Sequence, residues 1–362
     1  MGVGIFFKKI DWILITAAVL LVGIGLLSIY SSSLAEGDFS NFNKQAIFFT
    51  IGLALMLFLS FFDWRIFQEN SYLILILYLL CLAGLAGLFF FAPEIRGVKS
   101  WYRVGPVSID PIEFTKIILI IILAKYFSTR HVEMYQIRHI LLSGLYILLP
   151  AVLIFLQPDL GSVLILIALW VGILIISGIK VRHFLILLLC GLLILILSWG
   201  CLLKDYQKER ILSFAFPVDP LGASWSQNQA KIAIGSGGLL GQGIGQGSQT
   251  QYGFLPEPQT DFIFAAIAEE IGLIGVSVLL FLFIILIWRI FRIALSCKSN
   301  FPRFFATGLS IILIFQIFIH IGMNLGILPI IGISLPLISY GGSSLIATLA
   351  GLGILQNIKN NP

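Results

Sequence analysis

Ten runs of about 20 mostly apolar residues follow one another along the chain, and they constrain its fold more than any other feature. They lie at residues 10–30, 44–62, 72–92, 112–127, 138–157, 160–178, 183–203, 262–290, 303–326 and 338–357. Nine of them are long enough to cross the hydrocarbon core of a bilayer as a helix, whereas the fourth, residues 112–127, is short and polar at its start. The sequence therefore predicts an all-α polytopic membrane protein with ten transmembrane helices and one domain, residues 1–362.

The composition excludes the alternatives to a membrane protein. Of the 362 residues, 59% are hydrophobic and 11% are charged, whereas soluble domains carry roughly 25% charged residues. One soluble core of this length cannot bury such an excess, so soluble enzymes, disordered chains and small secreted scaffolds are excluded. The net charge of +5 is explained by membrane orientation, and we expect no nucleic-acid partner.

The basic residues predict that orientation. If the N-terminus is cytoplasmic, 13 of the 22 basic residues but only 4 of the 17 acidic ones lie on the cytoplasmic side. This is the asymmetry of the positive-inside rule. We expect a multi-pass protein of the plasma (inner) membrane with both termini in the cytoplasm. The inner basic residues are Lys8, Lys9, Arg65, Lys125, Arg130, Arg138, Lys180, Arg182, Arg289, Arg292, Lys298, Arg303 and Lys359.

One connection, residues 204–260, is much longer than the others, and we place it on the outer face. Loops of this length are usually functional or disordered. It contains a glycine-rich tract at residues 235–247 whose spacing fits neither a dinucleotide fingerprint nor a P-loop. The tract is either a flexible, turn-rich segment or a set of backbone N–H groups that cradles an anionic headgroup.

Charged residues stand at the start of the eighth run and inside it, where they are costly and mark functional candidates. Thr260 or Asp261 can cap this helix by accepting a free N–H group, which is the purely structural interpretation. Glu269 and Glu270 lie two turns further in. Two adjacent glutamates cannot both reach water by snorkelling, so at least one should face protein or a wet cavity.

A second charged cluster, residues 110–116, opens the fourth run. Glu113 and Lys116 are three residues apart and share a helix face. They are either an ion pair that makes the helix tolerable in lipid or part of a site. Arg103, upstream, stands among aromatic residues, a pattern also typical of a membrane-interface belt. A third polar segment, Gln157-Pro-Asp-Leu-Gly161, forms a turn between the fifth and sixth runs.

All three clusters fall on the outer side of the predicted topology. Acidic groups beside cations at the outer leaflet suit a lipid that carries a phosphate. The residues alone leave three functions open: chemistry on such a lipid, its transport, and scaffolding of another protein. Clustering on one face favours chemistry, because a transporter should also line a path toward the cytoplasm.

Five motifs, in order along the chain, resemble those of the SEDS family (shape, elongation, division and sporulation), most closely its RodA-type elongation members. The resemblance covers the chain from about residue 97 to its end. The motifs are Gln157-Pro-Asp-Leu-Gly161, Gln229-Ala-Lys-Ile-Ala-Ile-Gly-Ser-Gly-Gly-Leu-Leu-Gly241, Leu255-Pro-Glu257 with Thr260-Asp-Phe-Ile-Phe264, Asn324-Leu-Gly-Ile-Leu-Pro-Ile-Ile-Gly332 and Ser339-Tyr-Gly-Gly-Ser343.

The resemblance implies a peptidoglycan glycosyltransferase that polymerises lipid II at the outer face of the plasma membrane. Its implied partners are lipid II, the growing lipid-linked glycan strand, a class B penicillin-binding protein and other membrane proteins of the elongation complex. It implies that Asp261 is the essential acid and that Glu113, Lys116 and Arg210 are functional. Two positions depart from the family pattern: Asp110-Pro-Ile-Glu113 replaces its Gln-Pro-Ser-Glu, and Gln259 replaces its histidine.

These residues support an inverting transfer as a hypothesis. Asp261 would act as general base on the 4-hydroxyl of lipid II, while Lys116, Arg210 and Arg103 would hold the diphosphate. If a metal assists, Mg²⁺ or Mn²⁺ is expected, because hard cations prefer phosphate and carboxylate oxygens. The sequence does not select its ligands. A flippase for lipid-linked precursors and a non-catalytic scaffold for a penicillin-binding protein remain the alternatives.

Overall fold

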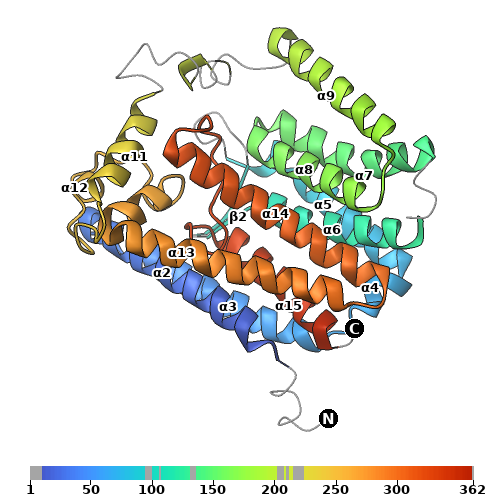
Figure 1. The fold of residues 1–362 in the computed structure, drawn as a ribbon, viewed down its shortest axis with the longest axis horizontal. Coiled ribbons are helices and arrows are strands. Elements are labelled where there is room, and N and C mark those ends of the chain that lie inside the picture. The colour runs from blue at the N-terminus through green and yellow to red at the C-terminus, as the bar shows by residue number, and fades with distance from the viewer. Residues whose placement is uncertain are drawn as a thin grey trace.

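The computed structural model describes residues 10–93, 100–105, 107–130, 136–201, 208, 212–214 and 224–360, and these are mostly helical (Figure 1). Each of the ten apolar runs forms a helix. The ten are α2 (Trp12–Glu36), α3 (Ser40–Phe61), α5 (Ser71–Phe91), α6 (Pro111–Arg130), α7 (Ile137–Leu156), α8 (Leu160–Ile176), α9 (Val181–Cys201), α13 (Ile263–Ser296), α14 (Asn300–Leu325) and α15 (Gly342–Asn360).

Seven helices in the described part of the chain are long and apolar enough to cross a membrane. Helix α8 is apolar but shorter, and α6 and α15 carry more polar residues. The seven are Trp12–Glu36, Ser40–Phe61, Ser71–Phe91, Ile137–Leu156, Val181–Ser198, Ile263–Ser296 and Asn300–Leu325. The chain is thus a multi-pass membrane protein.

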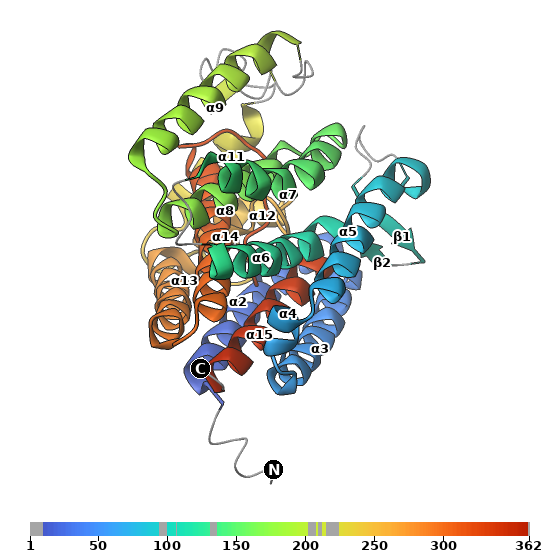
Figure 2. The same ribbon diagram turned by 90° about the vertical axis from the view of Figure 1, so that its right-hand side faces the viewer.

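The bundle is organised around two close helix pairs. Helices α2 and α13 run side by side along one side of the molecule, and α15 packs against α3 (Figures 1 and 2). Small residues allow such close approach: a Cβ added at Gly353 of α15 would lie 2.6 Å from the carbonyl oxygen of Met56 in α3. The remaining core lies between α14, α6 and α8.

One end of the bundle is fixed by an ion cluster around a buried carboxylate. Asp11, just before α2, accepts a hydrogen bond from Leu14 N–H and is paired with Arg289 of α13 (2.5 Å) and Lys359 of α15 (3.3 Å). The far end of α2 instead reaches Gln259, whose amide donates to Glu36. The predicted cytoplasmic cations and the predicted outer acids therefore lie at opposite ends of the bundle.

The end of the bundle opposite Asp11, called the outer end after its predicted orientation, carries short elements. Helices α11 (Trp225–Ser236) and α12 (Ser248–Gln251) gather there, at the opposite end of α13 from the C-terminus (Figure 1). Strands β1 (Tyr102–Val104) and β2 (Val107–Ile109) form an antiparallel hairpin in which Arg103 faces Ser108. The Tyr102 hydroxyl anchors this hairpin by donating to the Gly84 carbonyl of α5 (2.6 Å). The short α4 (Arg65–Glu69), which precedes α5, lies instead near the C-terminus (Figure 1).

Helix α9 differs from the other nine because it stands apart from the bundle in both views (Figures 1 and 2). Its leucine and isoleucine side chains are exposed almost all round. In water such a surface would be unfavourable, whereas lipid is as apolar as these side chains.

Candidate functional site

Asp261 lies in the turn that leads into α13, at the outer end of the bundle. Its side chain is partly buried, and its backbone carbonyl accepts a hydrogen bond from Asn324 Nδ2 (3.0 Å). The carboxylate lies beside the backbone of Gly332, where an added Cβ would be 3.8 Å from Oδ2. The N-cap position of α13 is occupied by Phe262, not by Thr260 or Asp261 as expected, and Phe262 supplies no side-chain cap.

The connection between α14 and α15, residues 326–341, joins Asp261 to the second acidic cluster. On one side, Ser339 Oγ donates to the Thr260 carbonyl (2.9 Å) and Gly332 adjoins the Asp261 carboxylate. On its other side, where the connection enters α15, the Ser343 hydroxyl accepts a hydrogen bond from Asp110 N–H (2.9 Å). The two clusters that the sequence singled out therefore flank a single connection.

The cluster around Asp110 is compact. Asp110 Oδ1 caps α6 by accepting from Ile112 N–H (2.8 Å), and Glu113 and Lys116 lie one turn further along the same helix. Burial, and after it the neighbouring charge of Glu113, raises the pKa of the Asp110 carboxyl well above its ordinary value of 3.8. Asp159, which caps α8, adds to this effect from the other side.

Lys116 is engaged within its own helix. Its ammonium lies 2.8 Å from Glu113 Oε2, and its side chain is only 3% exposed. In this geometry Lys116 neutralises Glu113, as the structural interpretation of the pair predicts. An ammonium has three N–H donors, so this pairing by itself does not exclude a diphosphate contact.

The glycine-rich tract donates a backbone hydrogen bond to a carboxylate of the protein itself. Gly245 N–H donates to Glu270 Oε1 (3.2 Å), and the Ser31 hydroxyl and the Gln251 amide donate to the same oxygen. Glu269, also buried, receives its donors from α12. Both glutamates face protein, as expected for at least one of them. The N–H group of Gly245, one of the backbone donors considered for a headgroup, is used within the protein.

A kink in α13 explains why the tract is rich in glycine. Gly272 has a left-handed φ of 71°, which interrupts the helical hydrogen-bond ladder. The backbone of the tract replaces it: Gln242 and Gly243 donate to the carbonyls of Glu269 and Glu270 (2.9 and 3.0 Å), and Leu273 donates to Gly238 (3.0 Å). Strand-like pairing of this kind requires close backbone approach, which a Cβ would prevent.

Gln259, where the family pattern has histidine, holds the turn before Asp261. Its Oε1 accepts from Asn41 Nδ2 (2.9 Å), and its backbone carbonyl accepts from Tyr340 N–H (2.8 Å). The side-chain contact is a hydrogen bond between two amides, and neither contact involves a proton transfer. Gln259 therefore links α3, the 326–341 connection and Asp261.

Two predicted site residues remain. Arg103 is exposed on β1, at the hairpin, and Arg210 lies outside the described residues. Two buried residues were left without a role by the sequence analysis: Asn324 contacts the Asp261 carbonyl, and His320 contacts the carbonyl of Ile333, next to Gly332. The available signal was their spacing, because residues four apart on a helix share a face.

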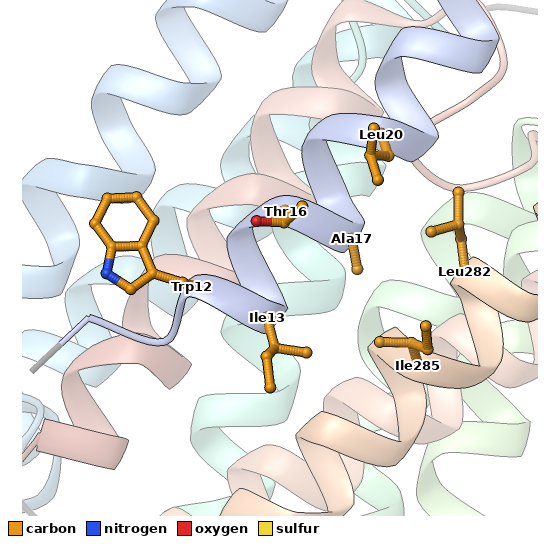
Figure 3. Close-up of a pocket in the computed structure, with 7 residues that line it drawn as sticks. All are labelled: Trp12, Ile13, Thr16, Ala17, Leu20, Leu282 and Ile285. Carbon is orange, nitrogen blue, oxygen red and sulfur yellow. The ribbon is translucent and has the colours of Figure 1, made fainter.

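The site at Asp261 is distinct from the apolar pocket on the side of the bundle. That pocket, about 310 Å³, lies between α2 and α13 and is lined by Trp12, Thr16, Leu20, Leu282 and Ile285 among others (Figure 3). At 1.5 Å per residue, Leu282 is roughly 30 Å along α13 from its outer end. The pocket lies toward the Asp11 end and offers no charged group.

No group of three or more His, Cys, Asp or Glu side chains in the described ranges is arranged to hold a metal ion. A protein cage for a divalent cation is therefore not found in that part of the chain. Mg²⁺ at phosphate-transfer sites commonly uses only one or two carboxylates together with substrate phosphates. The carboxylate of Asp261 fits that second arrangement.

Comparison with known proteins decides the family. Residues 11–362 match the FtsW/RodA/SpoVE family of cell cycle proteins. The chain belongs to this family. The match extends over almost the whole sequence and confirms the resemblance carried by the five motifs.

Curated relatives agree over nearly their full lengths. Stage V sporulation protein E of Bacillus subtilis (strain 168) is 37% identical over 362 residues, covering 96% of each chain. Peptidoglycan glycosyltransferase MrdB of Escherichia coli (strain K12) is 35% identical over 361 residues, covering 98% of this chain and 96% of MrdB.

Solved structures share the fold. A chain of the complex described as "Structural coordination of polymerization and crosslinking by a peptidoglycan synthase complex" superposes with a TM-score of 0.83, at 33% identity and 97% coverage of both chains. The rod shape determining protein RodA of Thermus thermophilus gives a TM-score of 0.71 at 32% identity, covering 97% of this chain and 96% of that one.

Proposed function

We propose that the chain is a peptidoglycan glycosyltransferase that polymerises lipid II at the outer face of the plasma membrane during cell elongation. The observation that carries this proposal is a partly buried carboxylate, Asp261, fixed between α13, α14 and the 326–341 connection at the outer end of the bundle. The names of its relatives, among them peptidoglycan glycosyltransferase MrdB, support the reaction class.

The chemistry needs one base and charge neutralisation. The lipid diphosphate on the growing strand is already a good leaving group, so no second carboxyl is needed to protonate it, unlike in inverting glycoside hydrolysis. Asp261 accepts the proton of the attacking 4-hydroxyl, a role worth about 10²–10⁴-fold. A divalent cation, Mg²⁺ or Mn²⁺, would supply charge neutralisation on the diphosphate when bound. We retain Glu113, Lys116, Arg103 and Arg210 as proposed substrate contacts.

Ten spans with cytoplasmic termini complete the proposal. Helices α6 and α15 join the seven candidates and α8 because 20 and 19 residues at 1.5 Å each reach about 30 Å, the thickness of the hydrocarbon core. Asp11, Arg289 and Lys359 then face the cytoplasm, and residues 204–260 lie outside.

A class B penicillin-binding protein is the proposed partner. One matching chain comes from a complex that coordinates polymerization with crosslinking. The crosslinking activity must then reside in another protein, because the mechanism proposed here makes only glycosidic bonds.

Labelled lipid II given to the purified protein tests the function, with glycan polymer as the readout. Polymer made without any penicillin-binding protein supports the transferase and excludes a purely scaffolding role. Movement of labelled lipid II between the leaflets of vesicles, with no polymer formed, would instead identify a flippase.

Cysteine labelling tests the topology independently. The native cysteines are removed and single cysteines placed at Gln246, exposed in the glycine-rich tract, and at Lys298, exposed between α13 and α14. A membrane-impermeant thiol reagent should label Gln246→Cys in intact cells and Lys298→Cys only after permeabilisation. The reverse pattern would place Asp261 in the cytoplasm and refute the proposal.

A further inference from the structure

Two side chains of α14, His320 and Asn324, are completely buried and lie four residues apart on one face of the helix. Both contact backbone carbonyls close to Asp261: Asn324 that of Asp261 itself, and His320 that of Ile333. Buried polar side chains in a membrane helix need partners. Here the partners are backbone carbonyls on two sides of the proposed active site.

Asn324 acts on the backbone of Asp261. Its Nδ2 donates to the carbonyls of Asp261 (3.0 Å) and His320 (2.8 Å), while its Oδ1 accepts from Ala265 N–H (3.2 Å). The first N–H groups of a helix have no acceptor within the helix, and the N-cap residue Phe262 supplies none. Asn324 therefore caps α13 from a neighbouring helix and fixes Asp261 to α14.

His320 acts on the opposite wall. Its Nδ1 lies 2.7 Å from the carbonyl oxygen of Ile333. A carbonyl only accepts, so Nδ1 must carry a proton and donate. Ile333 follows Gly332, the residue beside the Asp261 carboxylate. His320 therefore holds the backbone against which that carboxylate lies.

We propose that Asn324 and His320 are positioning residues for Asp261, with Asn324 fixing its backbone and His320 fixing the Gly332–Ile333 backbone beside its carboxylate. The inference rests on the proposed function, in which Asp261 is the general base. Its physical reason is that a misplacement of about 1 Å at a reacting group can cost about 10²-fold in rate. Because neither side chain binds substrate, their loss should lower kcat and leave KM unchanged.

Matched substitutions provide the test. Asn324→Leu removes all three hydrogen bonds at similar volume. His320→Leu removes the donor to Ile333, whereas His320→Asn places an amide nitrogen near the position of Nδ1 and should restore most of the activity. Phe318→Leu, on the same helix but exposed, is the control. We expect kcat to fall about 10²-fold in Asn324→Leu and at least about tenfold in His320→Leu, with KM for lipid II within about twofold of the wild type.

Backbone hydrogen exchange gives a second readout that does not depend on activity. In Asn324→Leu, exchange should quicken at the start of α13, Ile263–Ala266, and stay unchanged in α6. Wild-type kcat in Asn324→Leu, or unaltered exchange at Ala265, would overturn the inference. So would a loss of activity in His320→Leu that His320→Asn does not restore. If the wild type makes no polymer, the proposed function fails, and the exchange result alone decides whether Asn324 positions Asp261.

Discussion

Glu269, which is buried, and Glu113, which is partly buried, both lie near the outer end of the bundle, and they are stabilised in opposite ways. Glu269 receives only neutral donors: Gln249 N–H (2.6 Å) and Ser248 Oγ (3.3 Å) on one oxygen, and the N–H and hydroxyl of Thr250 (3.0 and 2.8 Å) on the other. Glu113 is neutralised by a cation, Lys116, three residues along the same helix.

This difference in partners distinguishes a carboxylate with a structural role, Glu269, from one that can take part in the chemistry, Glu113. The donors to Glu269 come from α12, so this carboxylate fastens the outer loop to α13 at the point where the chain turns back toward Asp261. The Glu113–Lys116 pair joins no two elements, since both residues belong to α6. An ion pair that links no two elements either makes the burial of both charges tolerable or is kept for binding substrate.

Breaking the ion pair should have the largest effect. Glu113→Gln or Lys116→Met alone leaves an unpaired buried charge, which typically costs about 3–5 kcal/mol of stability. The double variant should regain most of that loss, because no charge is left uncompensated. Thermal unfolding of the four proteins in detergent measures this cycle.

Activity in the same cycle decides what the pair is for. If Lys116 binds diphosphate, the double variant keeps a low activity and a raised KM for lipid II although its stability returns. Recovery of polymerisation in the double variant would establish the pair as purely structural and remove the phosphate role.

Neutralising Glu269 should have an intermediate effect. Glu269→Gln replaces an acceptor oxygen by a donor amide that faces N–H groups, and hydrogen bonds to a charged group are each worth about 1.5–3 kcal/mol. We expect a loss of about 2–3 kcal/mol and faster hydrogen exchange across Ser248–Gln251. The matched variant Ser248→Ala loses one long hydrogen bond, and equal destabilisation by the two changes would refute the docking role of Glu269.

The smallest effect is expected at Asp110, and it depends on pH. The folded-state pKa of Asp110 is raised by burial and by Glu113, so between about pH 4 and that raised value the folded protein holds the proton more tightly than the unfolded chain. Stability is therefore lost as the pH rises through this window. Asp110→Asn keeps the oxygen that caps α6 and removes the charge.

Thermal unfolding of Asp110→Asn at several pH values tests this sign. The variant should be more stable than the wild type at pH 7 and equal to it near pH 4. A difference that is the same at both pH values would show that the carboxyl of Asp110 is not strained by its surroundings.

The helices could be predicted from the sequence because each apolar run is long enough to specify its own element. The fourth run was expected at 112–127 and is Pro111–Arg130. Helix α2 continues six residues beyond the predicted end at residue 30, because the serines at its outer end are buried against the glycine-rich tract and Gln251.

Only the kinds of residue at the site could be predicted from the sequence, and not their contacts. Asp261, Glu113 and Lys116 stood out because charge near lipid is costly. The docking of the glycine-rich tract could not be predicted, since its partners are backbone N–H groups and carbonyls exposed by the kink at Gly272. Asn324 was missed for a related reason: it caps a helix that begins about sixty residues earlier in the chain, and caps are sought next to the helices they serve.

The central claim is that the Asp261 carboxylate removes a proton during lipid II polymerisation. The most direct measurement compares wild-type protein and Asp261→Asn, purified alike, with labelled lipid II under single-turnover conditions. Asparagine keeps the shape and removes the base, so we expect the rate to fall by about 10²–10⁴-fold while the unfolding temperature and the exchange at Ala265 stay the same. Polymer formed by Asp261→Asn at close to the wild-type rate would contradict the account.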